Sequence, residues 1–324
     1  MKLYAGFDCG GSHTRCLLVS DAGKCLGIGE SGPSNYLFCG KQKAAESILG
    51  SIDLAFADAG IPVEQITGIF VASAAVEVFA GADHEAFFKE VTGCLSLTCD
   101  SDIMPVWFAG SRFKPAVAMI SGTGAVTYLL RGDTFIKADG WGPQLGDAGS
   151  GYDVGLKALR LAARMADGRM QMNPDFYQAI LAHYQVDPGH PRRLWRVVNT
   201  GDARSQIASA AAVADRLFRE GNPVAEMLFE AAAQELFEAL TAVLAQTENE
   251  QFPLLLSGGM LRVGSPLYTL LCRKAEKLDR ITQIWTPTLP AVYSAAAIAL
   301  YQDGNMAAAE TLMRGDRERM QQLR

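Results

Sequence analysis

The chain has 324 residues, of which 49% are hydrophobic and 20% are charged. This composition excludes a disordered chain, and the length has room for two domains of ordinary size. The formal net charge of −6 provides no basic surface for nucleic acid. No apolar run reaches the length of a membrane span, and Asp8 interrupts the apolar segment after Lys2, which argues against a signal peptide.

The seven cysteines are scattered singly, without a C-x-x-C pair. This spacing argues against a zinc or iron–sulfur site and is typical of a protein in the reducing cytoplasm. We expect the cysteines to act as small apolar residues within strands and helices.

In chain order, the first half of the sequence reads as strands and turns followed by helix. Strands are expected at residues 3–8, 16–20, 25–30, 66–72 and 95–100, and a helix at about 42–59. Gly60 lies just past this helix, where glycine commonly ends a helix.

The second half repeats this plan. Strands are expected at residues 116–121, 125–130, 134–138 and 254–256, and helices at about 153–165, 205–220 and 223–246. Two similar halves predict a bilobed α/β protein with domains at 1–110 and 111–324, and the cleft between such lobes is the expected ligand site. The polar tail after Gln302 is expected to form a frayed surface helix.

A glycine turn with a hydroxyl residue lies between two strands in each half. The first is Cys9-Gly10-Gly11-Ser12-His13-Thr14, and the second is Ser121-Gly122-Thr123-Gly124. Glycine lets the backbone approach a phosphate closely, and the hydroxyl adds a donor. Either turn alone could equally be an ordinary hairpin, but the pair favours a phosphate ligand. Neither is a P-loop, because no Lys-[Ser/Thr] follows the glycines.

Several segments occur in the order known from one family. They are the segment Asp8–Arg15, Gly32-Pro-Ser-Asn35, the strand ending in Asp100, Ser121-Gly-Thr-Gly124, Gly140-Trp-Gly142, Leu145-Gly-Asp-Ala-Gly-Ser-Gly151 and Leu256-Ser-Gly-Gly259. Together they resemble the N-acetylglucosamine kinase branch of the BadF/BadG/BcrA/BcrD-type ATPases, within the sugar kinase, Hsp70 and actin superfamily. The resemblance implies a two-lobed ribonuclease H-like (actin-like ATPase) α/β fold with duplicated βββαβαβα-type halves and an interlobe cleft.

The resemblance also implies an ATP-dependent kinase that phosphorylates a sugar hydroxyl and acts as a cytoplasmic homodimer. The sugar is expected to be N-acetylglucosamine, phosphorylated at its 6-hydroxyl, or a related amino sugar. Domain 1–110 would bind sugar and phosphate, and domain 111–324 would bind nucleotide and form the dimer. No nucleic-acid or membrane partner is expected.

The expected ATP ligands lie on glycine-containing loops. Gly10, Gly11, Ser12 and Thr14 resemble the first phosphate loop, Gly122, Thr123 and Gly124 the second, and Gly258 and Gly259 the adenosine loop. For the last pair, a plain strand-to-helix turn is an equal alternative.

Two carboxylates at strand ends are expected to serve the chemistry. Asp8 would hold Mg²⁺ through water, since Mg²⁺ keeps several waters and takes few carboxylates; the alternative is a capped turn. Asp100 is expected to be the general base that accepts the proton of the sugar hydroxyl. Its competitor, Asp102, is expected in the first turn of a following helix, where a carboxylate is favoured.

Sugar recognition is expected around Ser34, Asn35, Gly140, Trp141 and Asp147, because sugar hydroxyls and an acetamide need donors and acceptors at fixed points. Two of these residues have alternatives. Trp141 could pack in the core, and Asp147 could cap the helix that begins near Gly151.

Some positions depart from the family pattern. Ser12 replaces a usual Thr, Ala148 a common Glu, and Ser73-Ala74-Ala75 a turn that contains glycine. These changes put the identity of the sugar in doubt more than the use of ATP. Two other functions stay open: an ATPase that activates a partner protein, and a non-catalytic sugar-binding regulator.

Overall fold

The computed structural model describes residues 1–10, 13–73, 76 and 81–315. The chain divides into unit 1, Met1–Arg112 with Pro287–Arg324, and unit 2, Phe113–Thr286. The first boundary lies close to the predicted one. The C-terminal segment differs from the prediction, because its helix α11 (Ala291–Gln302) packs against unit 1 and not against unit 2.

Unit 1 is built on a five-stranded sheet in the order β3-β2-β1-β4-β5. Its strands are β1 (Leu3–Cys9), β2 (Thr14–Ser20), β3 (Cys25–Ser31), β4 (Gly68–Ser73) and β5 (Leu97–Asp100). Strands β1, β2 and β3 are antiparallel neighbours, whereas β4 and β5 run parallel to β1.

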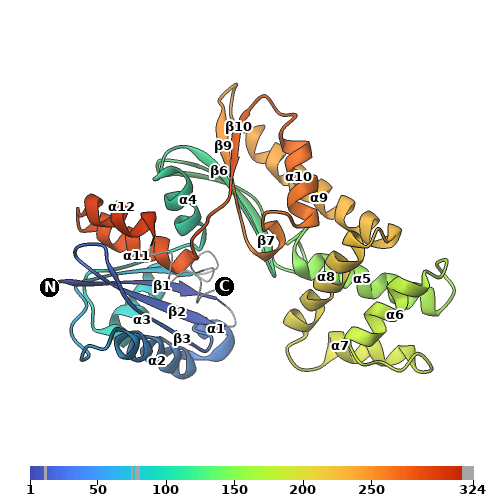
Figure 1. The fold of residues 1–324 in the computed structure, drawn as a ribbon, viewed down its shortest axis with the longest axis horizontal. Helices are drawn as coiled ribbons and strands as arrows, with labels where there is room; N and C mark the ends of the chain where they lie inside the picture. Colours follow the sequence, from blue (N-terminus) through green and yellow to red (C-terminus); the bar gives the residue numbers. More distant parts are fainter. Residues whose placement is uncertain (11–12, 74–75, 77–80, 316–324) are drawn as a thin grey trace. The chain divides into compact units, whose positions relative to one another are not determined.

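Helices cover both faces of this sheet (Figure 1). One side carries α2 (Lys41–Ala59) and α3 (Gly81–Thr92), and the other carries α11 and α12 (Met306–Arg314). Short helices α1 (Tyr36–Cys39) and α4 (Ile103–Ser111) follow β3 and β5. Helix α12 buries Ala308, Ala309 and Leu312, so the part of the tail that is described is a packed helix and not the frayed one expected.

Glycines in the sheet of unit 1 let helix backbones approach it directly. A Cβ at Gly29 would lie 2.1 Å from the carbonyl oxygen of Ser51 in α2, and one at Gly6 would lie 2.0 Å from the backbone nitrogen of Ala296 in α11. Because real Cβ atoms do not come this close, glycine is required at both positions for the helices to pack as they do.

Unit 2 repeats the topology in a sheet of order β10-β9-β6-β7-β8. Its strands are β6 (Ala116–Ser121), β7 (Ala125–Arg131), β8 (Thr134–Asp139), β9 (Phe252–Ser257) and β10 (Ile281–Trp285). The pairing directions match those of unit 1, with β6 in the place of β1. The duplicated halves of the predicted fold are therefore confirmed.

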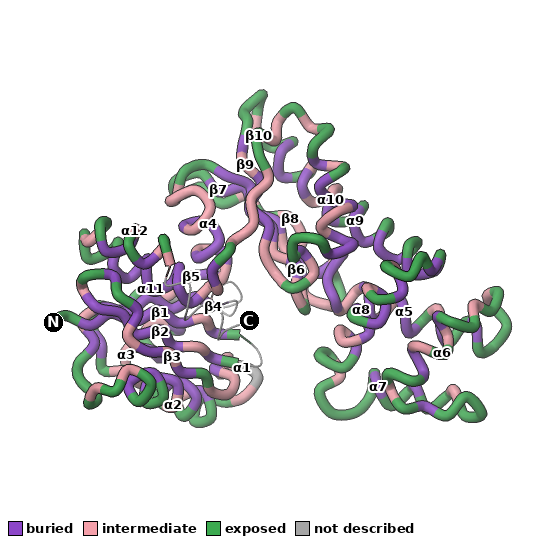
Figure 2. Tube along the Cα trace, in the orientation of Figure 1, coloured by how far each residue is buried: buried purple, intermediate pink, exposed green. Residues whose placement is uncertain are grey.

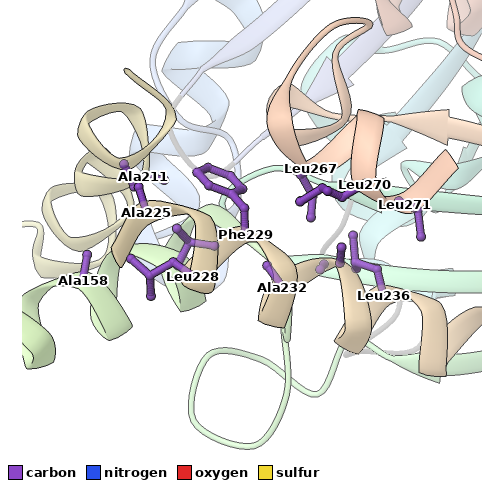
Figure 3. Packing of buried hydrophobic residues seen from close by; sticks show 14 of the residues in the cluster. Ala158, Ala211, Ala225, Leu228, Phe229, Ala232, Leu236, Leu267, Leu270 and Leu271 are labelled. Carbon is purple, nitrogen blue, oxygen red and sulfur yellow. The ribbon is translucent and has the colours of Figure 1, made fainter. Parts of the chain in front are cut away.

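The helices of unit 2 share one large core. They are α5 (Gly151–Ala166), α6 (Pro174–His183), α7 (Trp195–Asn199), α8 (Ala203–Arg219), α9 (Pro223–Leu244) and α10 (Pro266–Ala275), with short 3-10 helices at Pro191–Leu194 and Gly259–Leu261. Figure 3 shows the buried face of α9, from Ala225 to Leu236, beside Ala211 of α8 and Leu267 of α10.

Buried residues make up most of the strands and recur along the helices, as Figure 2 shows. None of the helices in the described ranges is both long and apolar enough to cross a membrane. The predicted strands and helices are all present, with small shifts at their ends.

Candidate functional site

A row of charged side chains crosses the sheet of unit 1. The strand registers align Glu30 with Arg15, Arg15 with Asp8, Asp8 with Ala72, and Ala72 with Asp100. Residues in register on neighbouring strands share a face of the sheet, and adjacent strands lie about 4.8 Å apart. The predicted metal ligand and the predicted base therefore lie on one face, about 10 Å apart across β4.

Asp8 is a half-buried carboxylate whose side chain has no hydrogen bond to any residue in the described part of the chain. Burial raises its pKa, Arg15 lowers it and Glu30 raises it. Arg15 is held by Glu30, with 2.7 Å between Nε and Oε2. A carboxylate whose oxygens accept no hydrogen bond from the described residues fits Mg²⁺. This ion takes one or two carboxylates and completes its coordination shell with water and phosphate oxygens.

Asp100 is the last residue of β5. Its Oδ1 accepts a hydrogen bond from the backbone N–H of the next residue, Ser101, at 2.7 Å. Asp102 occupies the N-cap position of α4, just before the first turn in which it was expected, and its side chain makes no capping hydrogen bond. The hydroxyl of Ser101 instead accepts from the N–H of Ile103 at 3.4 Å.

The first glycine turn is closed by Gly10, whose N–H donates to the carbonyl of His13 at 3.0 Å. Gly11 and Ser12, the other predicted ligands of this turn, lie outside the described residues, as do Ala74 and Ala75. Thr14 is fully buried and donates to the hydroxyl of Ser34 at 2.7 Å. The hydroxyls of Thr14 and Ser34 thus join the start of β2 to the segment before α1.

Asn35 lies directly before α1 and is half-buried, and its carbonyl accepts from the N–H of Cys39 at 3.1 Å. The next residue, Tyr36, stacks on the imidazole of His84 with 5.0 Å between ring centroids. His84 is 1% exposed, and neither ring nitrogen has a hydrogen-bond partner in the part of the chain that is described. The residue that follows the predicted sugar-binding segment therefore packs on a buried histidine.

We expect His84 to make the protein less stable in acid. Burial lowers its pKa, so the folded chain keeps the ring neutral while the unfolded chain takes up a proton below about pH 6.5. Its contribution to stability is complete above that pH and declines as the pH falls toward the folded pKa, by about 1.4 kcal/mol for each pH unit in this window.

The variant His84→Phe keeps a ring of similar shape and removes the titration. Chemical unfolding from neutral to acid pH should show a smaller loss of unfolding free energy in this variant than in the wild type. Parallel pH curves for wild type and His84→Phe would contradict the expectation.

The second glycine turn is tied to the start of α5. Gly122 donates its N–H to the carbonyl of Gly124 at 2.9 Å and accepts from the N–H of Gly151 at 2.7 Å. The carbonyl of Thr123 accepts from Tyr152 at 3.3 Å. Gly122 and Thr123 also line a pocket.

The predicted adenosine loop lies against the same turn. Gly258 has φ of 100°, and a Cβ there would lie 2.2 Å from the carbonyl oxygen of Ser121. A Cβ at Gly259 would meet nothing within 4 Å. The first glycine therefore lets β9 approach β6, and the second keeps space open.

A pocket of about 680 Å³ in unit 2 brings these loops together. Its lining comes from the second glycine turn, the adenosine loop and one side of α8. The lining residues are Gly122, Thr123, Gly151, Ala208, Ala211, Ala212, Asp215, Arg216, Arg219, Phe229, Gly259, Met260 and Arg262. The alanines of α8 supply a flat apolar surface, and the polar groups lie at the later end of the helix.

Some of the charges of this pocket are already paired. Arg219 contacts Asp215, with 2.6 Å between Nε and Oδ1, and donates to the carbonyl of Gly264 at 3.1 Å. Arg262 donates to the carbonyl of Gly259 at 3.1 Å. Arg216 is exposed and makes no ion pair with any described residue, so its guanidinium is available to an anionic or stacked ligand.

The loop 140–148 carries the remaining predicted sugar ligands. Trp141 is 75% exposed, so it is not a core residue, and the flanking Gly140 and Gly142 have φ of 73° and 84°. Asp147 is buried, and its Oδ2 lies 3.2 Å from an Nη of Arg204. Burial raises the pKa of Asp147, and Arg204 opposes that rise. Ser150 caps α5, which excludes that role for the Asp147 side chain.

Sequence reasoning missed Asp139, Arg204 and the charged residues of α8 that line the pocket. Asp139 follows a predicted strand, but nothing in the sequence shows that its carboxylate accepts hydrogen bonds from the loop 140–148. Helix α8 was predicted, and its run Ala-Ala-Ala-Val-Ala-Asp could have indicated a flat face that ends in charge. Only the tertiary structure shows which side of α8 faces the glycine loops.

The fold and the glycine loops are those of a nucleotide-binding ATPase, and comparison with known protein families identifies which one. The model of the BadF/BadG/BcrA/BcrD ATPase family matches residues 5–283. The chain therefore belongs to the BadF/BadG/BcrA/BcrD ATPase family.

Named relatives cover most of the chain. An N-acetylmuramic acid/N-acetylglucosamine kinase of Clostridium acetobutylicum is 25% identical over 278 residues, which are 83% of this chain and 88% of that protein. An N-acetyl-D-glucosamine kinase of Dictyostelium discoideum is 24% identical over 316 residues, 92% of this chain and 98% of that protein.

A solved structure from Chromobacterium violaceum, assigned as an N-acetylglucosamine kinase, superposes with a TM-score of 0.76 at 24% identity. The match covers 93% of this chain and 99% of that one. A ROK family glucokinase from Streptomyces griseus shares the fold at a TM-score of 0.54 and 15% identity, over 92% of this chain and 99% of that one. The predicted α/β fold with duplicated halves, which these kinase structures share, is confirmed.

Proposed function

We propose that this ATP-dependent sugar kinase transfers the γ-phosphoryl group of ATP to a hydroxyl of an amino sugar. N-acetylglucosamine, phosphorylated at its 6-hydroxyl, is the first candidate. The observation that carries the proposal is the row across unit 1 that aligns Asp8 and Asp100 on one face of the sheet. Relatives named as N-acetylglucosamine kinases support the choice of sugar.

In the proposed reaction, Asp100 accepts the proton of the attacking sugar hydroxyl. The sugar oxygen forms a bond to the γ-phosphorus while the bond from that phosphorus to the β–γ bridging oxygen breaks, and ADP leaves. Phosphoryl transfer depends on positioning and on neutralisation of charge rather than on covalent chemistry by the protein. Asp8 would hold Mg²⁺, which supplies the positive charge beside the phosphates.

The nucleotide is proposed to bind in the pocket of unit 2. Adenosine would lie against the alanines of α8 and over Gly259, and the turn at Gly122 to Gly124 would receive phosphates through its backbone. A pocket of about 680 Å³ has the size of an ordinary small-molecule site. Gly10 would contribute to the first phosphate loop, and the protein is proposed to act as a homodimer.

The test is ADP release from ATP and Mg²⁺ with a panel of amino sugars. We expect release that depends on N-acetylglucosamine or a close relative and that gives a sugar phosphate in equal amount. ADP release without sugar that rises with an added protein partner would favour the activator ATPase. Sugar binding without ADP release would favour the regulator.

A second expectation concerns the segment before α1. Asn35→Ala should raise the Michaelis constant for the sugar, because a buried ligand hydroxyl that loses its partner costs about 1–3 kcal/mol. ATP affinity without sugar should stay near that of the wild type. Calorimetry with each ligand checks this, and a variant that loses ATP but keeps sugar would show that Asn35 serves the nucleotide.

A further inference from the structure

Asp139 closes the loop 140–148 with a single carboxylate. It is the last residue of β8, and its Oδ1 accepts from the N–H of Gly140 at 2.7 Å and of Asp147 at 2.8 Å. Its Oδ2 accepts from the N–H of Ala148 at 2.8 Å. The two ends of the loop are therefore fastened to one side chain by charge-assisted hydrogen bonds, which are stronger than neutral ones.

The backbone around this carboxylate is shaped to receive it. Asp139 and Asp147 have φ of 61° and 58°, a region that residues other than glycine rarely adopt, although Asp is among those that do so most often. A Cβ at Gly146 would lie 2.1 Å from Oδ1 of Asp139. The loop thus accepts unfavourable backbone angles and requires a glycine in order to keep these hydrogen bonds.

The far end of the loop reaches the second glycine turn. A Cβ at Gly124 would lie 2.8 Å from Oδ2 of Asp147 and 3.2 Å from an Nη of Arg204. The Asp147 carboxylate is also held by Arg204, which lies in the first turn of α8. Movement of Asp147 would therefore change the contacts around Gly124, where the phosphates are proposed to bind.

We infer that Asp139 is a positioning residue for sugar binding, which fastens the loop 140–148 so that Trp141 and Asp147 are presented to the sugar. This inference rests on the proposed function. Without the carboxylate, the amides of Asp147 and Ala148 lose their acceptors, and the backbone angles at Asp139 and Asp147 lose the interactions that offset them. The loop would then sample other conformations, and only part of the population would bind the sugar.

The first test is Asp139→Asn. Asparagine tolerates the backbone angle, but its amide nitrogen cannot accept the N–H that now bonds to the second carboxylate oxygen. Hydrogen exchange should become faster at Asp147 and Ala148, and the Michaelis constant for the sugar should rise about tenfold while kcat changes less. Asp133→Asn, an exposed change in the turn before β8, is the matched control and should alter neither.

The two measurements separate the inference from the function on which it rests. Hydrogen exchange needs no activity, so unchanged protection of Asp147 and Ala148 in Asp139→Asn would overturn the fastening role even if no sugar were phosphorylated. Faster exchange with an unchanged sugar Michaelis constant would overturn the link to sugar binding. Failure of the wild type to phosphorylate any amino sugar would instead count against the proposed function.

A double-mutant cycle provides a second, independent test. Gly146→Ala should impair sugar binding in the wild type, because its methyl group would displace the Asp139 carboxylate. In an Asp139→Gly background that conflict is gone, and the nearest remaining atom is the backbone nitrogen of Trp141 at 3.0 Å. The effect of Gly146→Ala should therefore be much smaller there. An equal effect in both backgrounds would contradict the inference.

Discussion

Asp100→Asn should reduce turnover by about 10²–10⁴-fold, the range for removal of a general acid or base. The substitution keeps the size of the side chain and an oxygen that can accept the N–H of Ser101, but it removes the proton acceptor. Sugar and ATP should still bind. The loss should appear in kcat, because the interaction strengthens in the transition state. Steady-state kinetics with both substrates varied is the measurement.

Asp102→Asn is the matched control for this experiment. Asp102 occupies the N-cap position of α4, and its Oδ1 accepts from the hydroxyl of Ser101 at 3.4 Å. Asparagine keeps an oxygen that can accept this bond, so the substitution should cost little activity. A near-normal kcat for Asp100→Asn would remove Asp100 from the role of base. A collapse of kcat in Asp102→Asn would transfer that role to Asp102.

Gly258→Ala should damage the nucleotide pocket through the backbone. At φ of 100° and ψ of 160°, Gly258 has a conformation that is essentially restricted to glycine, and a Cβ would meet the carbonyl oxygen of Ser121 at 2.2 Å. We expect the free energy of unfolding to fall by about 3 kcal/mol and ATP affinity to fall by tenfold or more. Thermal unfolding and calorimetry with ATP would measure the two effects.

The adjacent glycine provides the contrast. Gly259 lines the pocket, and a Cβ there would meet no protein atom within 4 Å. Gly259→Ala should therefore leave the unfolding free energy near that of the wild type and weaken only ATP, whose adenosine would meet the new methyl group. Unchanged ATP affinity in Gly259→Ala would mean that the nucleotide does not pass over this glycine.

The sequence predicted the parts of the fold that depend on local pattern. The strands on either side of the glycine turns after β1 and β6 were predicted correctly, because each strand's pattern lies within neighbouring residues. The duplicated halves followed from the repeated pattern. Helix α11 was not placed, because its partner is β1, at the other end of the chain, and its packing depends on the missing side chain of Gly6.

Individual residues of the candidate site could be predicted from the sequence, but their arrangement in space could not. Asp8 and Asp100 were each chosen for their place at the end of an apolar strand. Their common row depends on the register of β1 with β4 and of β4 with β5, and these pairings join residues far apart in sequence. The same limit applies to Asp147, for which the sequence predicted sugar recognition with a helix cap as the alternative, and which is an ion-pair partner of Arg204 in the fold.

The division of the chain sets an order in which the protein can be assembled during synthesis. Unit 2 is one continuous stretch, Phe113–Thr286, and all of it leaves the ribosome before α11 does. Unit 1 begins at the first residue but needs α11 to cover Gly6 on β1. The face of this sheet that α11 covers therefore stays uncovered until the segment that follows unit 2 has been made. Domains otherwise tend to fold from the N-terminus onward, whereas the chain order here allows unit 2 to be completed before unit 1.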